Sequence, residues 1–237
     1  MIRFLAITVF LFGVGQGFSQ NMSATQLLDK AIAYHDPNHN WKYFDASFDI
    51  VMKTSKSSDR KSSIYLNVPK EIFQLAVEKD GVQYAYHFEK ENCSTSLNGS
   101  EEISDEARKK HRLTCERGGL MRDYYTYLYG LPMKLKDPGA NLSETVQKKV
   151  FKGKEYLVLK VNYDKNVGDD VWYFYFDTTT FAMEVYQFYH DEKKGDGEYI
   201  LLKDVAEIDG IKMPKVREWY YNSDDTYLGT DILNDVR

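Results

Sequence analysis

Apolar and polar residues alternate along much of this chain with a period of two. The clearest case follows Trp41, where apolar residues occupy alternate positions: Phe44, Ala46, Phe48, Ile50 and Met52. Such alternation is typical of a strand with one buried face. The stretches "IYLNV" and "IFQLAVEKDGVQYAYHF" continue the pattern, and Asp80–Gly81 inside the second predicts a hairpin.

Turn-forming strings such as "NVGD", "DTTT" and "DEKKGDG" separate further strand-like segments in the last third of the chain. We expect strands at about 154–163, 170–177, 180–190, 198–208, 211–222 and 226–236. Strands joined by such short turns pair as an antiparallel meander. The pattern lacks the alternation of strands and helices that would indicate a doubly wound parallel sheet.

Two regions follow helical spacing instead. Ser23 can cap a first helix at about 23–35, which Pro37 stops. In the middle, "SDEARKKHRL" and "GGLMRDYYTYLYGLP" predict two helical pieces, the second ended by Gly130 and Pro132. Helical spacing gives this second piece one apolar face, formed by Leu120, Tyr124, Tyr127, Leu128 and Leu131. Residues 133–150 show no regular pattern.

So many strands cannot form one flat layer, because a twisted sheet of this size must curl or close. The predicted fold is therefore mainly β (α+β). It is a curved antiparallel sheet, or half-barrel, whose concave face is covered by the N-terminal and mid-chain helices. Residues 20–237 contain no linker or repeat, so we expect a single domain. An interior larger than side chains can fill would become a ligand cavity.

The N-terminus resembles an export signal. Arg3 precedes an apolar run from Phe4 to Val14, and "GQGFSQ" offers a cleavage site near Ser19–Gln20. We therefore expect residues 1–19 to be a signal peptide and the mature protein to be periplasmic or secreted. No cysteine that could carry a lipid anchor lies near that cleavage site. The alternative is an N-terminal membrane anchor, although the run is short for a span.

Net charge and cysteine content limit the kinds of partner and metal site that this protein can have. The net charge of −5 argues against nucleic acid, whose phosphates require a basic surface. The only two cysteines, Cys93 and Cys115, favour a disulfide in an exported chain, and two free buried thiols are the alternative. Neither arrangement makes a zinc site without nearby histidines. The sequence contains no motif for a cofactor.

The segment "YHDPNHNW" at residues 34–41 gathers the candidate metal ligands His35, Asp36 and His39. Histidines four residues apart could bind zinc on one helix face, but Pro37 breaks the helix between them. We therefore expect a turn that leads into the first strand. Nucleophile elbows and phosphate-binding loops are absent from the sequence, so no catalytic residue is assigned.

Aromatic segments supply the candidate ligand site. In "VWYFYFD", Trp172, Phe174 and Phe176 share one face, over which the second mid-chain helix could lie. Tyrosines suit the mouth of an apolar pocket, because each has an apolar body and a polar tip. The candidate ligand-binding residues are Trp41, Phe44, Tyr124, Tyr127, Leu128, Met133, Trp172, Phe174 and Phe176. Ordinary core packing is the alternative for these aromatic residues. Lys134 and Lys136 could meet an anionic head group or could simply be solvated.

Three strings, "LLDKAIAYHDPNHNW", "YLYGLPMKLKDPG" and "VAEIDGIKMPKVREWY", resemble an uncharacterised family of exported bacterial proteins. That family is similar to the outer-membrane lipoprotein carrier fold (LolA/LolB-like). The third string is similar to the carriers' strand, glycine turn and apolar-x-Pro, here Gly210, Ile211 and Pro214. The resemblance covers the mature chain and implies a curved sheet whose helices close a hydrophobic cavity. No functional residue of the carriers matches a position here, and residues 90–118 look longer than in the carriers.

Three functions remain open. The first is a non-enzymatic protein that holds a hydrophobic small molecule, a lipid or the acyl part of a lipoprotein. The second is an envelope scaffold with a filled core, and the third is a hydrolase or metal enzyme built on His35, Asp36 and His39. After the N-terminal run, the sequence contains no segment apolar enough for a transmembrane helix. It leaves the oligomeric state undetermined.

Overall fold

The computed structural model describes residues 22–236, so the expected signal peptide at residues 1–19 lies outside the described part. The helices there are α1 (Ala24–His35), η1 (Trp41–Tyr43), α2 (Asp105–His111), α3 (Cys115–Gly130) and η2 (Met133–Lys136). The first five strands are β1 (Asp45–Thr54), β2 (Ser57–Asn67), β3 (Ile72–Lys79), β4 (Val82–Glu89) and β5 (Asn92–Leu97). The others are β6 (Ala140–Leu142), β7 (Gln147–Phe151), β8 (Lys154–Tyr163), β9 (Val171–Asp177), β10 (Met183–Tyr189), β11 (Glu198–Ile208), β12 (Ile211–Tyr221) and β13 (Tyr227–Val236).

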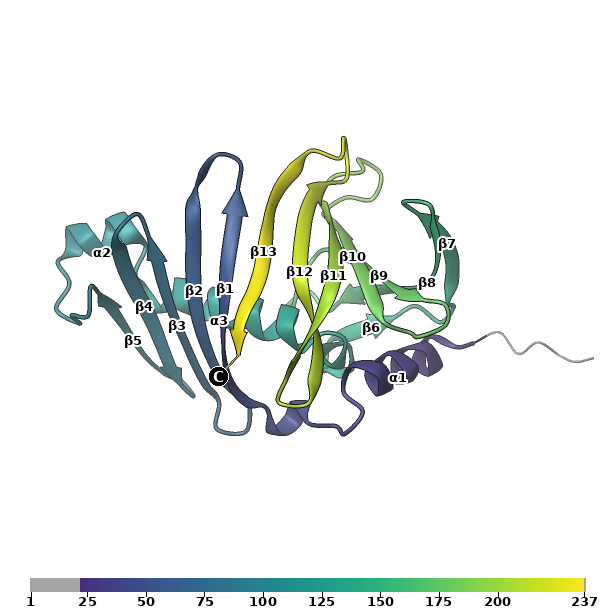
Figure 1. Cartoon of the computed structure of the whole chain (residues 1–237), viewed down its shortest axis with the longest axis horizontal. Helices are drawn as coiled ribbons and strands as arrows, with labels where there is room; N and C mark the ends of the chain where they lie inside the picture. Colours follow the sequence, from purple (N-terminus) through teal and green to yellow (C-terminus); the bar gives the residue numbers. More distant parts are fainter. Residues whose placement is uncertain (1–21, 237) are drawn as a thin grey trace, which may run out of the picture.

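All the strands belong to one open antiparallel sheet (Figure 1). Its order is β5-β4-β3-β2-β1-β13-β12-β11-β10-β9-β8-β6, with β7 also paired to β8. The last strand, β13, pairs with β1 on one side and β12 on the other. It thereby joins an N-terminal and a C-terminal meander into a single half-barrel, as the alternation of residues predicts.

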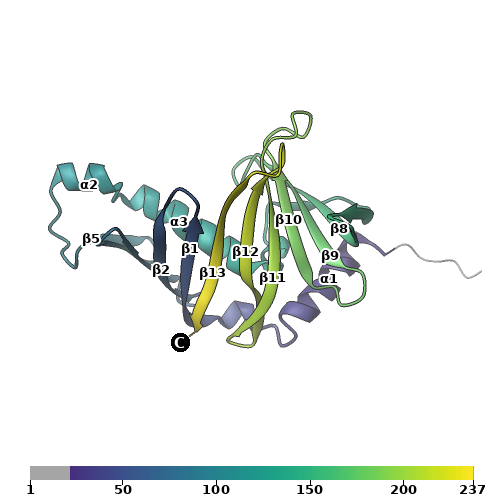
Figure 2. The same ribbon diagram turned by 45° about the horizontal axis from the view of Figure 1, so that its top comes forward.

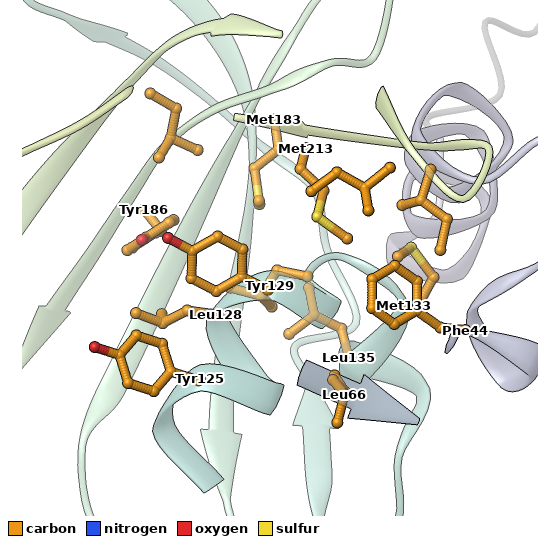
Figure 3. Packing of buried hydrophobic residues seen from close by; sticks show 14 of the residues in the cluster. Phe44, Leu66, Tyr125, Leu128, Tyr129, Met133, Leu135, Met183, Tyr186 and Met213 are labelled. Carbon is orange, nitrogen blue, oxygen red and sulfur yellow. The ribbon is translucent and has the colours of Figure 1, made fainter. Parts of the chain in front are cut away.

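Helices cover the concave face of this sheet. Figure 2 shows α3 running behind the central strands, while α1 lies beneath the C-terminal half. Buried apolar residues from these helices and from the sheet form one large cluster. Figure 3 shows part of it, with Tyr125, Leu128 and Tyr129 of α3 among residues of the sheet.

The helix α1 forms where the sequence predicts it. The Ser23 hydroxyl accepts a hydrogen bond from the backbone N–H of Gln26 (3.2 Å), and the Gln26 side chain accepts one from the backbone N–H of Ser23 (2.9 Å). This capping box satisfies two amides that the helix leaves free. The apolar stripe of α1, which includes Leu27, Leu28 and Ala31, is fully buried.

The buried face of α3 differs from the expected one. Leu120, placed on the apolar face by helical spacing, is 56% exposed, whereas Tyr125, Leu128 and Tyr129 are buried. Residues from 120 to 131 are apolar or aromatic at most positions, so spacing alone gives several overlapping faces. Contact with the sheet therefore selects the buried one.

One other region differs from the sequence-based expectation. Residues 133–150, expected to be irregular, contain η2, β6 and β7. The convex-facing residues of β9 are also buried, because a second cluster forms there with Tyr173, Tyr175 and Phe151. Phe151 lies in β7, and the centre of its ring is 5.2 Å from the centre of the Tyr175 ring. The β7–β8 hairpin therefore supplies the second cluster with a side chain.

Candidate ligand-binding groove

An open groove with a volume of about 740 Å³ lies against α3. It extends between the region where β2 turns into β3 and the connection from β8 to β9. Its apolar lining comes from Leu66, Ile72, Phe73, Tyr124, Tyr127 and Trp172, and we call it the α3 groove. Its volume falls within the range of small-molecule sites, which is about 300–1,000 Å³.

Aromatic contacts fix the wall of the α3 groove on the side of β8 and β9. The ring of Tyr127 lies 5.7 Å from Trp172 and 6.1 Å from Tyr163, edge to face in both cases. The hydroxyls of Tyr127 and Tyr163 are hydrogen-bonded to each other. Burial raises the pKa of both tyrosines, that of Tyr163 to about 12. Both phenols therefore remain neutral and suit an apolar ligand.

The lining of the α3 groove also contains charged residues, and two of its cations are paired. Lys134 forms an ion pair with Asp137, and Arg122 forms one with Asp123 at 3.0 Å. Lys136 pairs with Asp29 of α1 at 2.6 Å. The two lysines expected to be available for an anionic head group thus already contact carboxylates, which reduces their capacity to bind another anion.

The structure distributes the nine candidate ligand residues over three places. Tyr124, Tyr127 and Trp172 line the α3 groove. Trp41 packs at the C-terminal end of α3, where its indole leaves no room for a side chain larger than that of Gly130. The remaining residues are buried in the main core, and they are Phe44, Leu128, Met133, Phe174 and Phe176.

The segment "YHDPNHNW" forms the joint between α1 and β1. Both ring nitrogens of His35 bond to backbone, because Nδ1 donates to the Lys212 carbonyl (2.7 Å) and Nε2 accepts from the Met183 amide (2.9 Å). The Asp36 carboxylate accepts from the amides of Asn40 (2.7 Å) and Trp41 (3.0 Å). His35 and Asp36 are thus used to hold the joint together. Within residues 22–236, histidine, cysteine and carboxylate side chains form no cluster suited to a metal.

Sequence reasoning missed a row of three charged residues and one methionine on the concave face. Arg217 of β12 lies opposite Asp231 of β13. Asp231 also lies opposite Met52 of β1, which lies opposite Arg60 of β2. Arg217 is 1% exposed. We call these four residues the arginine row. The available signal was weak, because alternation in "MPKVREWY" places Arg217 on the side of apolar Met213 and Trp219 but also of Lys215.

The arginine row also contacts α3. The guanidinium of Arg217 lies 4.0 Å from the centre of the Tyr129 ring and donates to the carbonyls of Pro214 (3.0 Å) and Leu128 (3.5 Å). Arg60 lies within 3.4 Å of the Tyr125 hydroxyl. The helix therefore covers a polar strip of the sheet as well as apolar residues.

The disulfide predicted from the cysteine count is present. Cys93 of β5 and Cys115, the first residue of α3, are bonded, with their Cα atoms 5.9 Å apart. The bond attaches the N-terminal end of α3 to the edge of the sheet. The first turn of α3 is therefore held covalently against β5.

The helices within residues 22–236 lack the combination of length and apolar character that a bilayer span requires. Comparison with curated protein sequences gives no match.

Solved structures nevertheless share the fold. A LolA superfamily protein from Nitrosomonas europaea superposes with a TM-score of 0.51 at 10% identity, covering 91% of this chain and 93% of that one. A DUF1329 family protein from Desulfovibrio piger gives a TM-score of 0.54 at 10% identity, with 90% and 92% coverage.

A family model described as a family of unknown function (DUF6503) matches residues 2–235. The half-barrel, its helices and these superpositions agree with the resemblance carried by the three sequence strings. The chain therefore belongs to the DUF6503 family, and its fold is LolA-like.

Proposed function

We propose that this protein is an exported, non-enzymatic carrier that binds the apolar chain of a lipid, or the acyl part of a lipoprotein, in the α3 groove. The observation that carries the proposal is the groove itself, about 740 Å³ and lined by Phe73, Tyr127 and Trp172. Burying an acyl chain there contributes roughly 25 cal/mol per Å² of apolar surface removed from water. The LolA-like fold supports the same ligand class.

Export is part of the proposal. The basic residue and apolar run at the N-terminus support a signal peptide, and the Cys93–Cys115 disulfide fits an oxidising compartment. We place the protein in the periplasm or outside the cell. Western blotting of cell fractions tests this, and a cytoplasmic, full-length product would contradict it.

The binding proposal can be tested by blocking the groove. Val167 lines it and is 54% exposed, so Val167→Trp should fill space without disturbing the core. We expect titration with a fluorescent fatty acid to show at least tenfold weaker binding to this variant. Val150→Trp is the matched control, since Val150 is 72% exposed on β7, outside the groove. Equal loss in both variants, or no binding by the native protein, would contradict the proposal.

An envelope scaffold is the second candidate, and the packing beneath α3 favours it. Tyr125, Leu128 and Tyr129 are buried against the sheet, so the centre of the half-barrel is filled. Native mass spectrometry separates the two candidates. Copurifying lipid supports the carrier, whereas a lipid-free protein with a stoichiometric protein partner supports the scaffold.

A further inference from the structure

The arginine row contains more positive than negative charge. Arg217 and Arg60 remain protonated at any physiological pH. Asp231 is the carboxylate that acts electrostatically on both, and the other groups acting on them are tyrosines. Even with Asp231 ionised, the row therefore carries a net charge of about +1 inside the concave face.

Such an excess is costly where water is excluded. Arg217 is almost fully buried, and its two hydrogen-bond acceptors are neutral carbonyls. A buried charge is stabilised by an opposite charge and by hydrogen bonds that use its remaining donors. A ligand carrying one negative charge would supply both.

Unused polar atoms surround the arginine row. Among the described residues, the Nε atoms of Arg217 and Arg60, Oδ1 of Asp231 and the hydroxyls of Tyr129 and Tyr186 are buried without a hydrogen-bond partner. Buried polar groups are normally satisfied, so several in one place indicate an absent partner. Four of these five atoms belong to guanidinium or phenol groups, which are the donors that a carboxylate or phosphate accepts from, whereas Oδ1 of Asp231 only accepts.

The α3 groove lies next to this charged region. The indole Nε1 of Trp219 donates to Oδ2 of Asp231 (3.2 Å), and the Trp219 ring stacks on Tyr124 with centres 6.5 Å apart. Tyr124 is 36% exposed and lines the groove. Tyr124 and Trp219 thus connect the wall of the groove to Asp231 through direct contacts.

We propose that the arginine row binds the oxyanion, a carboxylate or a phosphate, of an amphiphile whose apolar chain lies in the α3 groove. The inference rests on the proposed function and narrows its ligand class. Charge-assisted hydrogen bonds to Arg217 and Arg60 hold the head group, and Asp231 balances the second arginine. Lys134 and Lys136 play no part, because Asp137 and Asp29 already pair with them.

Matched ligands test the head group separately from the chain. Hexadecanoic acid, hexadecyl phosphate and hexadecanol share one chain and should compete with a fluorescent fatty acid. We expect either charged ligand to bind at least tenfold more tightly than the alcohol. The stronger of the two identifies the oxyanion as carboxylate or phosphate.

Two variants assign that preference to the arginine row. Arg217→Met keeps the size and apolar stem of the side chain, and Arg60→Gln changes a less buried member of the row. Both should bind the charged ligands at least tenfold more weakly and leave hexadecanol binding unchanged. Lys215→Gln removes the same charge from an exposed position on β12 and should behave as the native protein.

The possible failures are distinguishable. Equal binding of acid, phosphate and alcohol by the native protein would overturn the head-group proposal and leave the apolar-chain function intact. A charge preference that survives in Arg60→Gln and in folded Arg217→Met would overturn it as well. Binding of none of the three ligands would remove both the proposed function and this inference. Thermal unfolding of each variant establishes that it is folded.

Discussion

His35 shows how a titratable residue can serve structure in this fold. It is buried, and its two ring nitrogens connect α1 to the backbone of β12 and β10 through Lys212 and Met183. The Met183 amide needs an unprotonated Nε2, so the pair of hydrogen bonds selects the neutral ring. Burial together with the nearby charge of Lys212 lowers the pKa of His35 from 6.5 to about 4.

A pH dependence of stability follows from that shift. Below pH 6.5 the unfolded chain gains a proton on His35 that the folded protein does not bind, so stability falls as the pH decreases towards 4. Between pH 7.5 and 5 this group should cost about 2 kcal/mol of unfolding free energy. Urea denaturation of native and His35→Gln proteins across this range measures it.

The comparison with His35→Gln isolates the contribution of this histidine from that of the carboxylates. The variant should be less stable at pH 7.5 but should lose less stability on acidification. His87→Gln, at an exposed position on β4, should keep the native slope. Parallel pH profiles for native and His35→Gln proteins would show that His35 does not control the dependence.

Gly118 and Gly119 are neighbours in α3 with opposite surroundings. A Cβ atom at Gly118 would lie 2.7 Å from Cδ1 of Tyr86 and 2.8 Å from Cε2 of Phe88, whereas one at Gly119 would meet nothing within 4 Å. Alanine favours a helix over glycine by about 1 kcal/mol. We expect Gly119→Ala to stabilise the protein by up to that amount and Gly118→Ala to destabilise it by about 1–3 kcal/mol.

Chemical denaturation of both glycine variants provides the measurement. Because intrinsic helix propensity acts equally at the two positions, the difference between them reports the contact of α3 with β4. If both variants are stabilised, α3 does not pack against Tyr86 and Phe88 as closely as described.

At the scale of elements, α3 determines the candidate site. It contributes Tyr124 and Tyr127 to the groove, and it covers the arginine row with Tyr125 and Tyr129. The disulfide fixes its first residue to β5. Its other end meets Trp41, whose indole would clash with a side chain added at Gly130.

Removal of the disulfide should loosen this helix. The bond joins residues 22 positions apart, and closing a loop of that length stabilises by about 3 kcal/mol through the unfolded chain. We expect Cys93→Ser/Cys115→Ser to lose roughly that amount. Hydrogen exchange should accelerate in the N-terminal turns of α3 and remain unchanged in α1. Uniform acceleration in both helices would indicate that the bond does not act locally on α3.

At the scale of the molecule, the position of β13 brings the two halves of the site together. It places Asp231 between Arg217 of the C-terminal meander and Met52 of the N-terminal one. The α3 groove likewise takes its lining from both halves, with Phe73 at one side and Trp172 at the other. A ligand in it would contact the two meanders at once.

Ligand binding should therefore stabilise the whole fold. A ligand that binds only the folded protein adds about 2.7 kcal/mol at a free concentration one hundred times its Kd, which for a chain of this size raises Tm by roughly 5–10 °C. We expect hexadecanoic acid to produce this shift in the native protein and in Val150→Trp. Val167→Trp should show a much smaller shift in differential scanning fluorimetry. Identical shifts in the two variants would mean that the acid binds elsewhere.

Much of the fold followed from local patterns. Alternation in β1, the turn at Asp80–Gly81 and the cap at Ser23 are each satisfied within a few residues, so neighbours along the chain are enough to predict them. The candidate site was less predictable. Tyr124, Tyr127 and Trp172 were proposed from their aromatic character and line the groove, whereas Phe174 and Phe176 of the same set are in the core. Aromatic side chains serve both roles, and composition does not distinguish them.

The sequence by itself determined most of the long strands, the first helix and the half-barrel class, because backbone geometry imposes periods of 2.0 and 3.6 residues on any buried face. It also favoured the Cys93–Cys115 bond, which the structure contains. Only the tertiary structure decided which side of α3 is buried, where the groove opens and that Arg60 shares a row with Arg217. These features depend on the register of β13 between β1 and β12 and on the path of α3 across the sheet. Both are set by contacts between residues far apart in the chain, and the local spacing of apolar residues does not predict such contacts.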